Sequence, residues 1–170
     1  MASRTPAICR WCDTGADFSP CGRYRYRLWR RWDAGPVAVW LLLNPSTADA
    51  TVNDATIERC QRRSARWGYG ALVVVNLFAL RATRPRELYR HPDPVGPDND
   101  GVILEAATRA DHVICGWGNH GLLGERGPRF ARLLLEHGCR LRCLGITARG
   151  QPRHPLFVPY ATPLRGMASQ

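Results

Sequence analysis

The feature that most constrains the fold is a series of short apolar runs, each followed by a polar or aromatic residue. The runs cover residues 37–43, 72–75, 112–115 and 141–145. Each is far shorter than the roughly 20 residues of a membrane-spanning helix, and a strand buried on both faces has this length and character. Helix-like segments at 54–67, 100–109 and 128–137 separate the runs. This alternation predicts right-handed βαβ units and a parallel sheet with helices on both faces.

The two ends of the chain lack this pattern. Residues 1–22 show no periodicity and are expected to be irregular, and the proline-rich stretch after residue 145 is expected to be loop. Arg23 to Leu28 alternate basic and apolar residues, which is typical of an edge strand. We therefore expect one α/β domain over residues 23–170. The start of the chain does not resemble a secretory signal, so the cytoplasm is the expected location.

The charge of the chain points to a polyanionic partner. The formal net charge is +10, and all 24 basic residues are arginine, with no lysine in the sequence. Arginine makes planar, bidentate contacts to phosphate and to guanine that lysine cannot make. Nucleic acid is therefore the expected partner, and nothing in the pattern indicates a membrane or an obligate protein partner.

The seven cysteines do not suggest a disulfide framework, because their number is odd and no export signal is evident. Cys9 and Cys12 form a C-x-x-C motif with Cys21 nearby, which could begin a zinc or iron-sulfur site. No second C-x-x-C follows, and the remaining cysteines sit singly in apolar patterns. The sequence thus favours reduced thiols, no metal and no cofactor.

Polar residues at the ends of the predicted strands mark the expected site. In open α/β sheets, ligands bind beyond the carboxyl ends of the strands, where loops and helix N-termini converge. The residues there are Asn44-Pro45-Ser46, Asn76, Trp117-Gly118-Asn119-His120 and, in the last loop, His154-Pro155. A single asparagine after a strand is usually a turn former, but four such groups favour a functional site.

These strand-end residues resemble motifs of the uracil-DNA glycosylase superfamily. Leu43-Asn44-Pro45 is similar to its water-positioning motif in the Asn-Pro form, and Val75-Asn76 resembles its base-reading asparagine. Trp117-Gly118 resembles its aromatic-glycine turn, and His154-Pro155 resembles the motif whose histidine supports the departing base. The resemblance covers roughly residues 37–160.

A second resemblance is closer but assigns no chemistry. Phe18-Ser19-Pro20-Cys21-Gly22, Asn44-Pro45-Ser46-Thr47-Ala48-Asp49 and His154-Pro155-Leu156 are similar to a bacterial and phage family of unknown function. The glycosylase resemblance implies a three-layer α/β/α sandwich with a four-stranded parallel sheet in the order 2-1-3-4, to which the edge strand at residues 23–28 is added. Residues 23–170 would then form one glycosylase-like domain.

From this resemblance and from the position of each residue we hypothesise the following roles. Asn44 would hold the attacking water, Asp49 or Asp54 would face the sugar cation, and His154 would donate to the departing base. Base contacts would come from Pro45, Ser46, Asn76, Trp117 and Asn119, and phosphate contacts from Arg81, Arg84, Arg149 and Arg153. The expected activity is that of a DNA glycosylase, which flips a base out of the stack and leaves an abasic site.

Two features narrow this expectation. Glycosylases that also cut the strand form a Schiff base through an amine, and the absence of lysine therefore predicts a monofunctional enzyme. Ser46-Thr47-Ala48 lacks the aromatic residue expected of a uracil pocket. A modified pyrimidine is therefore the expected base, and glucosylated hydroxymethylcytosine in phage DNA would give the protein a role in antiviral defence.

Two other readings stay open at this stage. One is a non-catalytic nucleic-acid-binding module, in which the arginines of residues 23–31 hold phosphate and Tyr24, Tyr26 or Trp117 stacks on bases. The other is a hydrolase or transferase that acts on free nucleosides or nucleotides in the same pocket.

Overall fold

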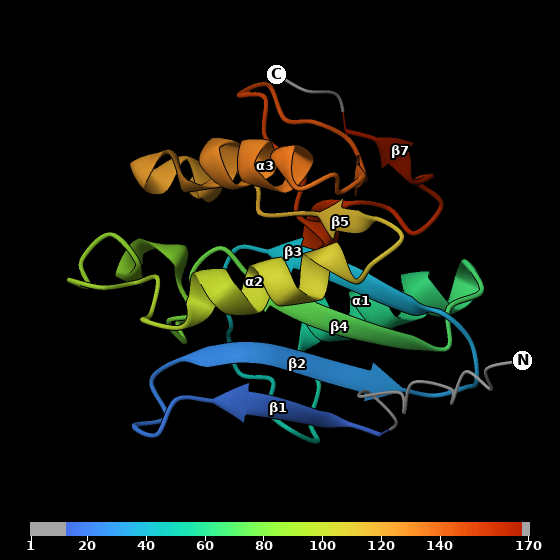
Figure 1. The fold of residues 1–170 in the computed structure, drawn as a ribbon, viewed down its shortest axis with the longest axis horizontal. Helices are drawn as coiled ribbons and strands as arrows, with labels where there is room; N and C mark the ends of the chain where they lie inside the picture. The colour runs from blue at the N-terminus through green and yellow to red at the C-terminus, as the bar shows by residue number, and fades with distance from the viewer. Residues whose placement is uncertain (1–12, 168–170) are drawn as a thin grey trace, which may run out of the picture.

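The computed structural model describes residues 13–167, whose strands form one mixed sheet. Its seven strands lie in the order β1-β2-β4-β3-β5-β6-β7. Figure 1 shows α2 in front of this sheet and α1 behind it. The described part of the chain is therefore α/β with helices on both faces, as the alternation of strands and helices predicts.

Four neighbouring strands in the middle of the sheet carry the predicted apolar runs. They are β3 (Val37–Leu42), β4 (Ala71–Asn76), β5 (Val113–Cys115) and β6 (Leu141–Cys143). β3 pairs in parallel with both β4 and β5, and β5 pairs in parallel with β6. Every residue of β4 is buried, as expected for a strand covered on both faces. The carboxyl ends of these four strands consequently lie at the same edge of the sheet.

The sheet is larger than the predicted four parallel strands, because antiparallel strands extend it on both sides. β1 (Gly15–Phe18) pairs with β2 (Arg25–Arg31), β2 pairs with β4, and β7 (Arg165–Gly166) pairs with β6. The expectation that residues 1–22 are irregular is thus wrong for residues 15–18. The expectation that residues 23–28 form an edge strand is also wrong, since β2 lies between β1 and β4.

Three of the four arginines of β2, Arg25, Arg27 and Arg30, are buried, which the alternating pattern did not indicate. Arg27 forms ion pairs with Asp17 at 2.6 Å and with Glu105 at 3.2 Å. Arg30 donates to the side chain of Asn53 at 2.8 Å and to the carbonyl of Asp49 at 2.7 Å. A buried charge is tolerated only when it is paired and hydrogen-bonded, and these partners come from segments distant in the sequence. They allow β2 to be an interior strand.

Three α-helices cover the sheet close to their predicted positions: α1 (Ala55–Arg66), α2 (Asn99–Thr108) and α3 (Arg126–Glu136). Asp54 caps α1, because its Oδ1 accepts the N–H of Ile57 at 2.9 Å. One apolar cluster packs α2 and α3 on the sheet, and a second packs α1 on the opposite face. Within residues 13–167, no helix combines the length and the apolar character that a membrane crossing requires.

Short 3₁₀ helices occupy the connections at the carboxyl edge: η1 (Pro85–Glu87), η2 (Asn119–Glu125) and η3 (Pro155–Phe157). The region after residue 145 is otherwise irregular apart from β7, close to the prediction. These connections form the loops that surround the ends of β3, β4 and β5.

Candidate functional site

A cavity of about 480 Å³ opens at the carboxyl ends of the parallel strands. The loops after β3, β4 and β5 and the last long loop of the chain contribute its walls. The lining residues are Leu43, Asn44, Ser46, Thr56, Ala82, Thr83, Pro85, Trp117, Gly118, Asn119, His120, Thr147, Arg153, His154, Leu156 and Phe157. This is the position at which ligands bind in open α/β sheets, and the volume lies in the range of small-molecule sites.

Asn44 lies in the cavity wall and also links two of the segments that form this wall. Its Nδ2 donates to the carbonyls of Pro45 and Ala82, both at 2.8 Å. The second bond ties the loop after β3 to the segment after β4. Both amide hydrogens are used by the protein, which leaves Oδ1 as the atom that can accept a hydrogen bond from a water in the cavity.

His154 lines the same cavity and is held in one tautomer. Its Nδ1 accepts the backbone N–H of Leu156 at 3.2 Å. Burial lowers the pKa of His154 to about 4, and the negative charge of Asp54 opposes this shift. At neutral pH the imidazole is therefore uncharged and carries its proton on Nε2. The cavity wall thus contains a neutral hydrogen-bond donor.

The wall that carries His154 is fastened to α1 by two arginines. Arg59 donates to the carbonyls of Pro155 at 3.0 Å and of Val158 at 2.5 Å. Arg63 donates to Val158 at 2.5 Å and to Pro159 at 2.9 Å. Burial lowers the pKa of Arg63, but the group remains charged at neutral pH. The sequence pattern of residues 54–67 predicts a helix but does not indicate that its arginines bind a loop about 95 residues further along the chain.

Trp117 and Asn119 are fixed by contacts within the protein. The side chain of Trp117 is buried, and its Nε1 donates to Oε1 of Gln151 at 2.9 Å. A Cβ on Gly121 would lie 2.0 Å from Cδ1 of this indole. The ring can therefore pack against residue 121 only because that residue has no side chain. Asn119 accepts a hydrogen bond from Thr147 at 2.7 Å. Trp117 is therefore a rigid part of the wall and not a free platform for stacking.

Asp49, Asp54 and Pro45 do not line the cavity. Oδ1 of Asp49 accepts the backbone N–H groups of Val52 at 2.8 Å and of Thr51 at 2.9 Å, which lowers the pKa of Asp49. Asp54 caps α1. Pro45 is buried, and its carbonyl accepts from Ala82 as well as from Asn44. The structure gives both carboxylates a structural role in the segment between β3 and α1.

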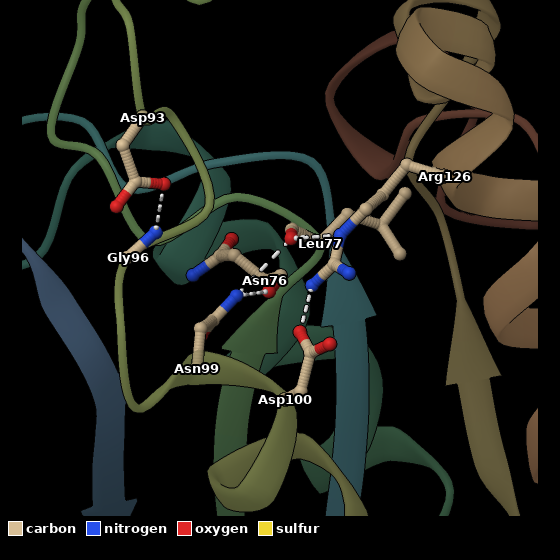
Figure 2. A network of polar contacts seen from close by, with 7 residues as sticks. All are labelled: Asn76, Leu77, Asp93, Gly96, Asn99, Asp100 and Arg126. Carbon is tan, nitrogen blue, oxygen red and sulfur yellow. Dashed lines mark hydrogen bonds and ion pairs between the residues drawn. The ribbon is translucent and has the colours of Figure 1, made fainter.

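Asn76 ends β4 and is 1% exposed, without lining the cavity. Figure 2 shows the polar network around it: Asn99 donates to the carbonyl of Asn76 at 2.9 Å and to that of Leu77 at 3.1 Å. Arg126 donates to Leu77 at 2.9 Å and pairs with Asp100. Among the described residues, Nδ2 of Asn76 has no hydrogen-bond partner. The amide that would read a base is therefore closed off from the cavity in this conformation.

The predicted phosphate-binding arginines occupy different places. Arg153 lines the cavity, whereas Arg81, Arg84 and Arg149 are exposed outside it. Arg81 donates to the carbonyl of Gly22 at 3.1 Å and lies over the ring of Phe18. The structure therefore brings only one of the four arginines directly to the cavity.

Several lining residues were not predicted from the sequence. Four contribute hydroxyl or aromatic groups to the wall or its rim: Thr56, Thr83, Thr147 and Phe157. Phe157 is 74% exposed, although it is large and apolar. It follows His154 by three residues. The sequence does not indicate that it is exposed, because the neighbouring Val158 is also apolar and is buried.

Most of the arginines and one of the two aromatic residues of β2 are buried. Arg25, Arg27 and Arg30 are buried, and Tyr26 is 7% exposed. Arg25 donates to the carbonyl of Ala48 at 2.7 Å, and burial lowers its pKa to about 10. Most of the β2 side chains on which the binding-module hypothesis was based are therefore not accessible to nucleic acid.

The candidate metal cluster falls partly outside the described residues. Cys9 and Cys12 lie there, and Cys21 is exposed with its Sγ 3.3 Å from Oγ of Ser19. Between residues 13 and 167, no three histidine, cysteine or acidic side chains form a group that could hold a metal ion.

Comparison with known proteins gives one match. Residues 25–156 match the family described as "Protein of unknown function (DUF1643)". This range begins in β2, spans all three α-helices and ends in η3, so it contains Asn44 and His154. No curated protein and no solved structure matches the chain.

Proposed function

Since the chain belongs to this family, whose description assigns no chemistry, we propose from the cavity itself that the protein is a monofunctional DNA glycosylase. It would hydrolyse the N-glycosidic bond of a modified pyrimidine and leave an abasic site. The observation that carries the proposal is the presence, in one cavity, of Asn44 and a neutral His154. The four parallel strands β4-β3-β5-β6 also agree with the order 2-1-3-4 that the resemblance to uracil-DNA glycosylases implies.

The reaction needs three contributions from the protein. The target nucleotide leaves the base stack and enters the cavity. As the bond between C1′ and the base nitrogen breaks, its electron pair moves to the base, and Nε2–H of His154 donates to the base oxygen on which charge develops. A neutral donor fixed in place stabilises that charge without reorganisation. A water that donates to Oδ1 of Asn44 then adds to C1′, and its released proton balances the negative charge of the base.

Asn44 and His154 could be positioned in advance for this reaction. Asn44 is tied to the segment after β4 by its bond to Ala82, and the loop after His154 is tied to α1 by Arg59 and Arg63. Asp54 lies outside the cavity but acts on the pKa of His154 through its charge. We therefore assign Asp54 an indirect electrostatic role in place of direct contact with the sugar cation.

Hydroxyl groups among the lining residues support a base that carries a large hydrophilic substituent. Ser46, Thr56 and Thr83 line the cavity, and each hydroxyl can donate and accept. Such groups suit the hydroxyls of a hydroxymethyl or glucosyl substituent better than they suit a methyl group. Glucosylated hydroxymethylcytosine in phage DNA is accordingly the substrate we favour, with antiviral defence as the biological role.

The absence of lysine supports hydrolysis without strand cleavage. A glycosylase that is also a lyase forms a Schiff base between an amine and C1′, and the sequence contains no lysine. Borohydride added during the reaction is expected to trap no covalent adduct of protein and DNA. A trapped adduct on denaturing gel electrophoresis would show that an amine, such as the N-terminus, takes part.

The test of the proposal uses duplexes with uracil, hydroxymethylcytosine, glucosylated hydroxymethylcytosine or unmodified cytosine. Purified protein is incubated with each duplex, and abasic sites are then cleaved with alkali. We expect breaks at a modified base, and about 100-fold slower formation of breaks with His154→Gln, because loss of one fixed donor to a developing negative charge typically costs that much or more. His137→Gln on the exposed end of α3 is the matched control and should leave the rate unchanged.

The same experiment separates the competing functions. Intact strands in every duplex would contradict the glycosylase proposal. If free modified nucleosides were hydrolysed while all duplexes stayed intact, the cavity would belong to a nucleoside hydrolase.

A further inference from the structure

A second hollow, of about 430 Å³, lies beside the cavity and is lined mainly by basic side chains. We call it the arginine hollow. Its lining residues are Arg23, Leu80, Arg81, Glu87, Arg90, His91 and Pro92. Three guanidinium groups and one imidazole thus face one carboxylate. In a protein whose net charge is already +10, the three guanidinium cations are stabilised by an anion that binds between them.

Internal contacts hold two of these basic side chains in place. Arg81 donates to the carbonyl of Gly22 at 3.1 Å, and its guanidinium lies 5.0 Å from the centre of the Phe18 ring. Nδ1 of His91 accepts the N–H of Asp93 at 3.1 Å, and the ring contacts Tyr24 edge-on. The floor of the hollow is therefore ordered before a ligand arrives.

The other two arginines are open to a ligand. Arg23 and Arg90 are exposed, and within residues 13–167 neither side chain makes a hydrogen bond or an ion pair. Glu87 is the one acidic lining residue, and its Oε1 accepts the backbone N–H of Arg84 at 3.2 Å. This carboxylate lowers the net charge of the hollow but leaves it positive.

One chain segment joins the arginine hollow to the cavity. Leu80 and Arg81 line the hollow, and Ala82 and Thr83 directly after them line the cavity. Farther along the segment, the hydroxyl of Tyr89 contacts Nδ1 of His120 at 3.1 Å on the cavity rim. A polymer with one unit in the cavity would therefore have its neighbouring units close to the arginine hollow.

We propose that the arginine hollow binds the phosphodiester backbone of the DNA strand next to the nucleotide that enters the cavity. The inference rests on the proposed function for the identity of the polymer. Arg23 and Arg90 make the flexible phosphate contacts, while Arg81 and His91 form the fixed base of the site. Phosphate contacts position a DNA strand without reading its sequence, so this site sets which nucleotide can reach His154.

The experiment measures binding of labelled, unmodified DNA by fluorescence anisotropy at several salt concentrations. The variant Arg23→Gln/Arg90→Gln removes two charges from the hollow, and Arg129→Gln/Arg132→Gln removes two exposed charges from α3 as the control. Because each phosphate contact adds about one to the slope of log affinity against log salt, we expect the hollow variant to lower that slope by about two. Its affinity should fall about 10-fold or more at low salt, and the control should stay close to wild type.

The outcomes separate this inference from the proposed function. A slope for the hollow variant equal to that of wild type or of the control would overturn the inference, whatever the enzyme does to a modified base. A reduced slope, together with no base release from any duplex, would support the phosphate site and contradict the glycosylase. Thermal unfolding of both variants checks that the exposed substitutions leave the fold intact.

Discussion

The two sides of the cavity are held by contacts of very different kinds. On one side, residues 154–158 form what we call the His154 wall, and Arg59 and Arg63 donate to its backbone carbonyls from α1. On the other side, residues 84–90 form what we call the Tyr89 rim. Leu88 packs in the core, but the hydrogen bond from this segment to η2 joins two exposed residues, Tyr89 and His120. Charge-assisted hydrogen bonds away from water are strong, whereas exposed ones contribute little.

This difference suggests that one side of the cavity holds the catalytic group and the other side admits the substrate. A group that stabilises charge in a transition state must be fixed beforehand, and His154 lies on the side that is firmly held. A substrate as large as a flipped nucleotide needs one side of the cavity to move when it enters. The Tyr89 rim is placed for this, because it borders both the cavity and the arginine hollow. The predictions below test whether the two sides differ in this way.

The largest effect is expected at Arg63. Arg63→Met would leave the carbonyls of Val158 and Pro159 with fewer donors in a buried place and should lower the free energy of unfolding by about 3 kcal/mol. Arg62→Met is the control on the same helix, because Arg62 is exposed and pairs only with Glu58 at the surface. Its loss should be below about 0.5 kcal/mol in urea denaturation. Equal losses in the two variants would contradict the firm attachment of the His154 wall.

A somewhat smaller effect is expected from pH. The pKa of His154 is about 4 in the folded protein, against about 6.5 for a free histidine. Between these values the unfolded chain binds a proton at this position and the folded chain does not, so stability present above pH 6.5 is lost as the pH falls towards 4. The difference between these pKa values corresponds to about 3 kcal/mol. Because the ring is partly exposed to water, which screens the charge, the expected loss is about 2 kcal/mol. Comparing urea denaturation of wild type and His154→Gln across this window measures it, and parallel pH profiles would show that His154 is not buried.

The smallest effect on stability is expected at the Tyr89 rim. Tyr89→Phe removes the hydroxyl that contacts His120, and both groups are exposed, so the free energy of unfolding should change by less than about 0.5 kcal/mol. If the rim helps to hold the substrate, KM for a modified duplex should rise while kcat stays the same. A loss of stability as large as that of Arg63→Met would remove the contrast between the two sides.

Sequence reasoning located the parallel centre of the fold because apolar runs report burial directly. β3 and β4 fall within a residue or so of the predicted runs, and α1 begins at Ala55, one residue after the predicted start of the helix at residue 54. β2 was misjudged because alternating arginines look solvent-exposed when their partners are unknown. Arg27 can be buried because it pairs with Asp17 and Glu105. A local sequence pattern cannot indicate a partner such as Glu105, which lies 78 residues away.

The same distinction applies to the site. Asn44 and His154 follow predicted breaks in regular structure, and the structure brings both to one cavity. Asp49 and Asp54 looked similar in the sequence, yet they satisfy backbone N–H groups of a loop and a helix start. Asn76 ends a strand as predicted, but its side chain faces the interior. A residue's place after a strand thus fixes the edge of the sheet on which it lies, whereas its access to the cavity depends on packing.

The central claim is that the cavity breaks a bond between a base and its sugar, and the most direct measurement is mass spectrometry of both products. A duplex with glucosylated hydroxymethylcytosine is incubated with wild type or with Asn44→Ala, and free base and abasic strand are quantified. The account predicts one free modified base for each abasic strand with wild type, and at least about 100-fold slower release with Asn44→Ala. Tight binding of modified duplexes with no free base from any of them would contradict it.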